Sequence, residues 1–220
     1  MATRRRVRGW DARLGWAYGL TADDAAVRSA ALGRLVEAQK NVADAAAHWN
    51  ETWRRGWQPG RVMASRRYSQ AARQSFPAAL AESPVGPGVV TWPGLPYALL
   101  YLEWEARHPQ EWTRHAKCWG TKQRLIRGLA VVGHDDAVVR RLADLIEVVV
   151  RRPYRCKDRE YVRVARAIDS DDLRNRLAAA AGSDSPCARR HAGYVLWLLE
   201  RPAVPNTRRV WRSWLESGSG

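Results

Sequence analysis

The chain has 220 residues, enough to bury a core without disulfide or metal staples, and 37 Lys and Arg residues against 22 Asp and Glu residues give it a net charge of +15. No apolar run approaches the roughly 18 residues of a membrane span, and three widely spaced cysteines do not make a disulfide framework. These features exclude a membrane-spanning or disulfide-stapled protein and predict a cytoplasmic one with a polyanionic partner.

Two explanations compete for the abundance of arginine. Only four of the basic residues are lysines (Lys40, Lys117, Lys122 and Lys157). Arginine is the better bidentate ligand for phosphate, but a GC-rich genome would also enrich arginine, and alanine with it. The net charge therefore supports binding to a polyanion, whereas the ratio of arginine to lysine adds little.

The first part of the chain predicts a basic arm followed by one long helix. Residues 1–20 are irregular and begin with Arg4, Arg5 and Arg6; we interpret them as a basic arm rather than an export signal. Thr21 resembles an N-cap, with Asp24 completing a capping box. Apolar residues then recur every three or four positions as far as Trp53, which predicts a helix within 21–58 that buries Trp53.

Residues 59–96 are the least regular stretch and predict a Pro/Gly-rich basic connection. Its first half could form a short helix before Pro77. Val89-Val90 could form at most a short strand. A loop of this length is either functional or a linker. The basic patch within it consists of Arg61, Arg66, Arg67 and Arg73.

In residues 97–216, proline, glycine and capping residues recur at short intervals and mark the ends of helices; residues 217–220 form a tail. Short helices with short connections and little strand pattern indicate an all-α helical array or bundle. The predicted helices cover residues 97–108, 110–119, 121–132, 135–152, 157–168, 172–181, 186–200 and 206–216.

Three segments share a frame of Asp, then Arg, then Ala, and they begin at Asp23, Asp135 and Asp184. The last one carries the frame most fully, with Pro186, Arg189, Ala192 and Leu196. In this pattern the sequence resembles HEAT-like helical repeats over roughly half of the chain. The resemblance implies a curved stack of helices with a concave binding surface.

The sharpest functional feature is a stripe of arginines three or four positions apart. Like charges at that spacing repel one another, and a row of phosphates would compensate them. A solvated face neutralised by Asp158, Glu160 and Asp169 is the alternative, and we favour phosphate binding. The stripe consists of Arg152, Arg155, Arg159, Arg163 and Arg166.

The sequence gives little support to a metal site or to catalysis. His115 with Cys118 and Cys187 with His191 could together make a Cys₂His₂ set, but the two pairs lie far apart and lack the usual knuckle turns. No phosphate-binding loop, nucleophile elbow or zinc-protease motif occurs. We therefore predict neither a metal nor a cofactor, and no catalytic residue.

The leading hypothesis is a non-enzymatic nucleic-acid-binding protein, or a subunit of a nucleoprotein complex with further protein partners. Its DNA or RNA phosphates would contact the arginine stripe, the arm and the basic patch. A protein-interaction scaffold of HEAT type is one alternative. Another is a DNA glycosylase, because the chain resembles HEAT-like alkylpurine glycosylases in length, charge, helicity and tryptophan content. That enzyme would need an acid in a basic cleft, for which the candidates are Asp135, Asp136, Asp171 and Asp172.

Overall fold

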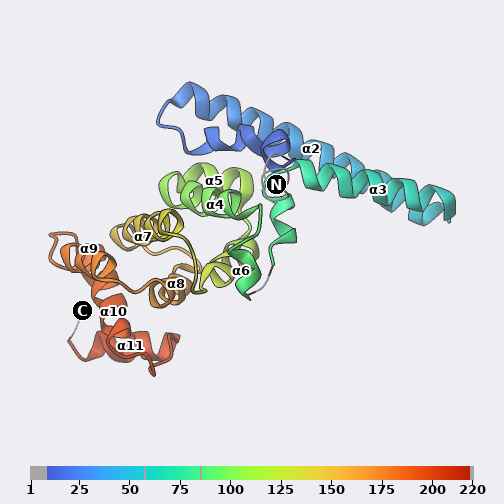
Figure 1. Cartoon of the computed structure of the whole chain (residues 1–220). Helices are drawn as coiled ribbons and strands as arrows, with labels where there is room; N and C mark the ends of the chain where they lie inside the picture. The colour runs from blue at the N-terminus through green and yellow to red at the C-terminus, as the bar shows by residue number, and fades with distance from the viewer. Residues whose placement is uncertain (1–8, 57, 85, 219–220) are drawn as a thin grey trace. The chain divides into compact units, whose positions relative to one another are not determined.

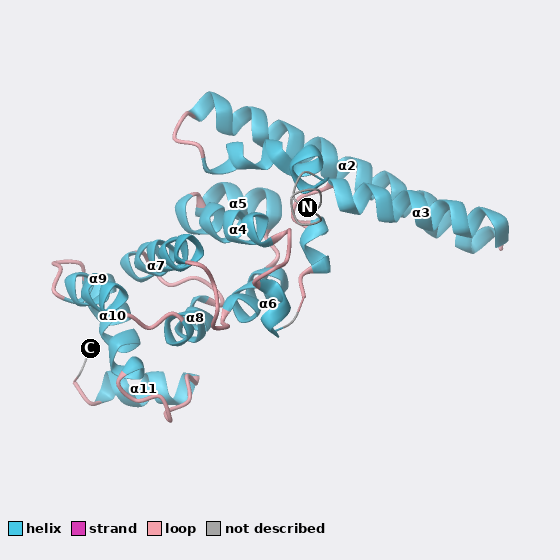
Figure 2. Cartoon of the chain, in the orientation of Figure 1, coloured by secondary structure: helices cyan, strands magenta, loops and turns pink. Residues whose placement is uncertain are grey.

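The computed structural model describes residues 9–56, 58–84 and 86–218, and within these ranges it contains helices, turns and loops but no strand (Figures 1 and 2). The predicted all-α fold is confirmed. None of the helices in these ranges combines the length and apolarity needed to cross a bilayer. The chain forms two compact units: one contains residues up to Ser83 together with Pro93–Lys117, and the other Pro84–Trp92 together with Cys118 onward.

The first unit contains two 3₁₀ segments, η1 (Gly15–Thr21) and η2 (Ala78–Glu82), and the helices α2 (Ala25–Arg55), α3 (Gln58–Gln74), α4 (Leu95–Arg107) and α5 (Pro109–Ala116). Helices α2 and α3 pack along each other as a helical hairpin (Figure 1). Helix α4 contacts η1 and α5 and is buried over most of its length. Its apolar residues on all sides explain why it lies inside the protein.

The long N-terminal helix exists, but two details of its prediction are wrong. Asp24 is the N-cap and accepts hydrogen bonds from the N–H groups of Ala26 and Val27, so α2 begins after it rather than after Thr21. Trp53, expected in the core, is 50% exposed. Ala31 and Leu35 of the apolar stripe are buried, and Trp49 stacks on Tyr68 of α3 at 5.3 Å between ring centroids.

The predicted irregular connection over residues 59–96 is mostly helical. Its first half is α3, a helix of 17 residues. Pro59-Gly60 does not separate α2 from a loop, because Pro59 lies in the first turn of α3, where a missing N–H costs no helical hydrogen bond. The proposed strand at Val89 is the end of a 3₁₀ segment, η3 (Gly86–Val89).

The second unit is an array of short helices. It contains η3, α6 (Trp119–Leu129), α7 (Asp136–Arg151), η4 (Asp158–Glu160), α8 (Tyr161–Ala167), α9 (Asp171–Ala181), α10 (Pro186–Leu199) and α11 (Arg208–Glu216). Helices α9 and α10 pack against each other and both contact α7 (Figure 1). Each helix lies within a few residues of its predicted position, except that the predicted helix 157–168 divides into η4 and α8.

Two of the three segments with the shared Asp…Arg frame begin their helices in the same way. Arg28 of α2 donates to the carbonyl oxygens of Ala22 and Asp23, and Arg189 of α10 donates to those of Ser183 and Asp184. Each arginine lies four residues after its N-cap and fixes the chain that enters the helix. In α7 the N-cap is Asp135, the first residue of the shared frame, whereas in α2 and α10 the N-cap is the second residue. The arginine of the frame in α7, Arg140, therefore lies five residues after its N-cap rather than four. HEAT-like repetition stays a prediction.

Candidate functional site

The predicted basic arm and basic patch have different outcomes. Arg4, Arg5 and Arg6 lie outside the described residues. In the patch, Arg61 contacts the face of Trp53 at 4.1 Å and donates to its carbonyl oxygen, and Arg73 pairs with Glu82 at 2.9 Å. Arg66 is exposed on α3 and lines a shallow hollow with Arg73, while Arg67, also exposed, lines a different one.

The predicted arginine stripe is divided among several segments, and Arg159, Arg163 and Arg166, predicted on one helix, do not share one. Arg152 is the C-cap of α7, Arg155 lies in the following loop, Arg159 is in η4, and only Arg163 and Arg166 belong to α8. Lys157, just before η4, has a left-handed conformation with φ of 72°. The five side chains therefore have different surroundings and different partners.

Arg152 belongs to a buried charge cluster around Asp158. The carboxylate of Asp158 accepts hydrogen bonds from Lys122 at 2.6 Å and from both terminal nitrogens of Arg152 at 2.9 and 3.2 Å. It also accepts from the backbone N–H of Arg155 at 2.7 Å. The Lys122 side chain is completely buried. This cluster, named below the Asp158 triad (Lys122, Arg152 and Asp158), anchors the loop between α7 and α8.

Arg163 is compensated by a neighbouring carboxylate. Glu160 pairs with Arg163 at 3.0 Å and with Arg127 at 2.8 Å, and it accepts a further hydrogen bond from Gln123. Burial alone would raise the pKa of Glu160, but the hydrogen bonds from Arg127 and Gln123 hold this pKa below its ordinary value of 4.5. Glu160 is thus ionised at neutral pH and offsets much of the local positive charge.

The guanidinium group of Arg166 binds backbone carbonyl groups. Its Nη2 group lies 2.7–3.2 Å from the carbonyl oxygens of Leu198, Arg201 and Val204. These carbonyls lie at the end of α10 and in the loop that follows it, where helices leave backbone acceptors unsatisfied. Arg166 therefore fastens the end of α10 to α8.

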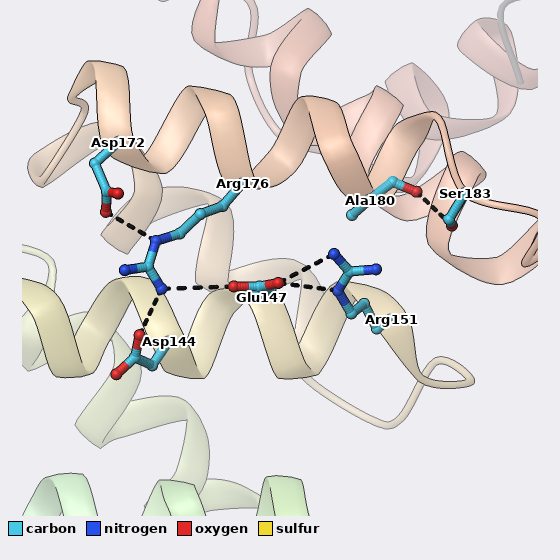
Figure 3. Close-up of polar contacts among 7 residues, drawn as sticks. All are labelled: Asp144, Glu147, Arg151, Asp172, Arg176, Ala180 and Ser183. Carbon is cyan, nitrogen blue, oxygen red and sulfur yellow. Dashed lines mark hydrogen bonds and ion pairs between the residues drawn. The ribbon is translucent and has the colours of Figure 1, made fainter.

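The face between α7 and α9 is also neutralised (Figure 3). Arg176 of α9 lies between Asp144 at 2.5 Å, Glu147 at 3.5 Å and Asp172 at 2.8 Å. Glu147 in turn pairs with Arg151 at 3.0 Å. Three carboxylates thus face two guanidinium groups, and this face does not favour an anion.

A pocket of about 530 Å³ is lined by α7, η4, α8, α10 and α11. Five aromatic rings line it, those of Tyr154, Tyr161, His191, Tyr194 and Trp211. His191 lies between Tyr154, at 6.3 Å between ring centroids, and Trp211, at 6.2 Å. Trp211 meets Tyr194 edge to face at 4.6 Å and stacks on Trp214 at 5.5 Å. Aliphatic side chains complete the lining: Ile146, Val149, Val150, Val162 and Val195.

Three arginines also line this pocket: Arg159 of η4, Arg190 of α10 and Arg208 of α11. Within the described part of the chain none of the three forms an ion pair with a carboxylate. Asp158 reaches the pocket as well, but each of its oxygens already accepts two hydrogen bonds from the triad and from the N–H of Arg155. The pocket is therefore electropositive and offers no free carboxylate to a cation.

Burial shifts the pKa of two pocket rings, His191 and Tyr194, toward their uncharged forms. Burial lowers the pKa of His191 below its ordinary 6.5, although the carbonyl groups of Val150 and Arg152 and the charge of Asp158 act in the opposite direction. Burial raises the pKa of Tyr194, whose hydroxyl donates to Asn206 at 3.2 Å. Asn206 also donates to the carbonyl of Arg159, so this contact connects the pocket wall to η4.

The metal and glycosylase candidates do not meet in this pocket. Among the described residues no group of three or more His, Cys, Asp or Glu side chains could hold a metal ion. The four candidate acids, Asp135, Asp136, Asp171 and Asp172, do not line the pocket. Asp135 caps α7 and Asp172 pairs with Arg176, which gives both of them structural partners.

Of the pocket arginines, the sequence pointed only to Arg159. Arg190, Arg208 and the rings of Tyr154 and Trp211 come from segments far apart in the chain. One local signal did exist, because Trp211 and Trp214 alternate with arginines in α11.

Comparison with protein-family models, with curated proteins and with solved structures finds no match for this chain. Any functional assignment therefore depends on the residues and their geometry.

Proposed function

We propose that the protein binds nucleic acid, without catalysis, and that its main phosphate-binding surface lies around the pocket of the second unit. The single observation that carries this proposal is the set of three pocket arginines, Arg159, Arg190 and Arg208, without carboxylate partners among the described residues. Arg209 and Arg212 of α11 do not line the pocket, but they are exposed and lie near Arg208 in the sequence. Guanidinium groups in such a row fit successive phosphates of a nucleic-acid backbone.

The contrast within the same unit supports this location. Arg163, Arg174 and Arg176 each pair with a carboxylate, and Arg166 binds backbone carbonyls. An arginine that already has a partner gains little from a phosphate, because the existing ion pair must first be broken. The arginines around the pocket do not carry this cost, so the proposal moves from the predicted stripe to the pocket and keeps only Arg159 of it.

The test is equilibrium binding of the whole protein to labelled single- and double-stranded DNA and RNA across a salt series. Arg190→Gln/Arg208→Gln is compared with Arg54→Gln/Arg55→Gln, which removes the same charge from two arginines paired with Glu51. Each phosphate contact contributes about 0.7 to the slope of log affinity against log salt for a single strand, so the pocket variant should lose about 1.4. The control variant should keep its slope.

Two results would refute the proposal. Binding that does not respond to salt would show that phosphates contribute little. Equal losses in the two variants would show that net charge matters and the pocket does not.

A protein partner is the second candidate, favoured by the α2–α3 hairpin. Trp53, Val62 and Met63 lie beside the turn between the two helices and are 50%, 55% and 69% exposed. Apolar side chains gathered at one place on the surface are typical of a protein interface. A Val62→Ser/Met63→Ser variant would lose such a partner in a pull-down at high salt while keeping its affinity for nucleic acid.

A further inference from the structure

The pocket has the size and lining of a site for one small ring-bearing group. Its volume of about 530 Å³ lies within the range of small-molecule sites, about 300–1,000 Å³. Its walls are apolar: aliphatic side chains from α7, α8 and α10, with aromatic rings beside them. Such a wall favours a flat, weakly polar ring over a hydrated ion.

The rings are positioned by their neighbours. Trp211 is held edge to face by Tyr194 and is backed by Trp214, which is only 3% exposed. Tyr154, by contrast, is 49% exposed, so its ring can adjust to an incoming group. His191 lies between the half-exposed phenol of Tyr154 and the fixed indole of Trp211, so a ligand ring would stack on one of these two rings rather than enter between them.

The charges at the pocket select the remainder of the ligand. Arg159, Arg190 and Arg208 favour a group that carries negative charge, and Asp158 is saturated by its own hydrogen bonds. His191 is a neutral ring, because burial lowers its pKa. A cationic ligand is therefore disfavoured, and an inorganic anion would leave the aromatic lining unused.

We propose that this pocket receives the base of one unpaired nucleotide, with the adjoining phosphates on Arg190 and Arg208. The proposal rests on the proposed function and names the strand that it prefers. A nucleotide combines a flat ring with an anion one sugar away, as the pocket lining requires. In a duplex the faces of each base are covered by its neighbours, so only an unpaired base can present a face to Trp211 or Tyr154.

The test compares two single strands with the same number of phosphates. One is a thymidine oligomer of about 12 nucleotides, a length within the site sizes of single-strand binders. The other is the same oligomer without bases. The wild-type protein should bind the base-bearing strand at least about five-fold more tightly, the smallest effect expected from stacking one base. Adenosine monophosphate should displace the strand at lower concentration than inorganic phosphate does.

Variants locate the preference. Tyr154→Ala and Trp211→Leu should bind the two strands with equal affinity, at the same salt slope as the wild-type protein. Trp53→Ala, which removes an exposed tryptophan from the first unit, should keep the preference. If Trp211→Leu fails to fold, as judged by circular dichroism, Tyr154→Ala decides, because its half-exposed ring contributes little to the core.

The outcomes separate the two proposals. Equal, salt-dependent binding of both strands by the wild-type protein overturns the nucleotide pocket and leaves the proposed function standing. Binding of neither strand overturns the proposed function. A preference for bases that survives in Tyr154→Ala and Trp211→Leu overturns this location for it.

Discussion

The Asp158 triad predicts that its three members contribute very unequally to stability. Asp158→Asn would remove the carboxylate that pairs with the completely buried Lys122 and with Arg152, and the new amide would turn an N–H group toward these donors. Removing one partner of a buried pair typically costs about 3–5 kcal/mol of the free energy of unfolding. We expect a loss within this range for Asp158→Asn.

Lys122→Met should cost much less, although Lys122 is the most deeply buried of the three. Asp158 would keep three of its four hydrogen bonds, those from Arg152 and Arg155, and one charge-assisted bond is worth about 1.5–3 kcal/mol. The variant would also no longer bury an ammonium group, which offsets part of that loss. Together these contributions predict a destabilisation below about 2 kcal/mol.

The assay is urea unfolding followed by circular dichroism, with the double variant Lys122→Met/Asp158→Asn completing a mutant cycle. The double variant should be more stable than the sum of the single losses predicts, because it also removes the ammonium group whose ion pair with Asp158 is lost in Asp158→Asn. Lys40→Met and Asp44→Asn are matched controls in an exposed pair and should leave the unfolding midpoint nearly unchanged. A loss for Lys122→Met equal to that for Asp158→Asn would refute this account of the triad.

Three further predictions concern side chains outside the triad. Arg166→Ala should lower the free energy of unfolding by about 1.5–3 kcal/mol, because backbone carbonyls lose a charged donor, whereas Arg163→Ala should change thermal stability little. The folded pKa of His191 lies below 6.5, so the unfolded chain binds more protons and stability should fall as the pH drops below about 6.5; His191→Asn should reduce that slope in pH-dependent thermal melts. Burial also lowers the pKa of His108, so His108→Asn should likewise reduce the fall in stability at low pH. The double variant His108→Asn/His191→Asn should reduce it by the sum of the two effects.

The helices of the second unit could be predicted because their boundaries are local. Ser170 and Ser185 each accept a hydrogen bond from a backbone N–H three residues later, and proline or glycine ends several helices nearby. The start of α3 was missed for an equally local reason: Pro59-Gly60 stops a helix when it follows one but is tolerated when it opens the next.

The candidate site could be predicted only in part, because the neutralisation of an arginine depends on distant residues. The carboxylate that binds Lys122 is 36 residues away in sequence, and the closest partner of Arg176 is 32 residues away. A stripe of evenly spaced arginines therefore looks uniform in the sequence, but its members have different roles in the fold. Arg152 pairs with Asp158, Arg166 binds backbone carbonyls at the end of α10, and Arg159 lines the pocket. The pocket itself needs five helical segments, α7, η4, α8, α10 and α11, to come together.

The burial of Lys122 has a practical consequence for measuring motion in the second unit. The chain has four lysines, and Lys40 and Lys117 are exposed while Lys157 is partly so. Amine-reactive reagents should modify these three in the native protein and reach Lys122 only when the unit opens. The rate at which Lys122 becomes modified, followed by mass spectrometry, would then report how often the loop between α7 and α8 detaches, with the other three lysines as internal references for reagent activity.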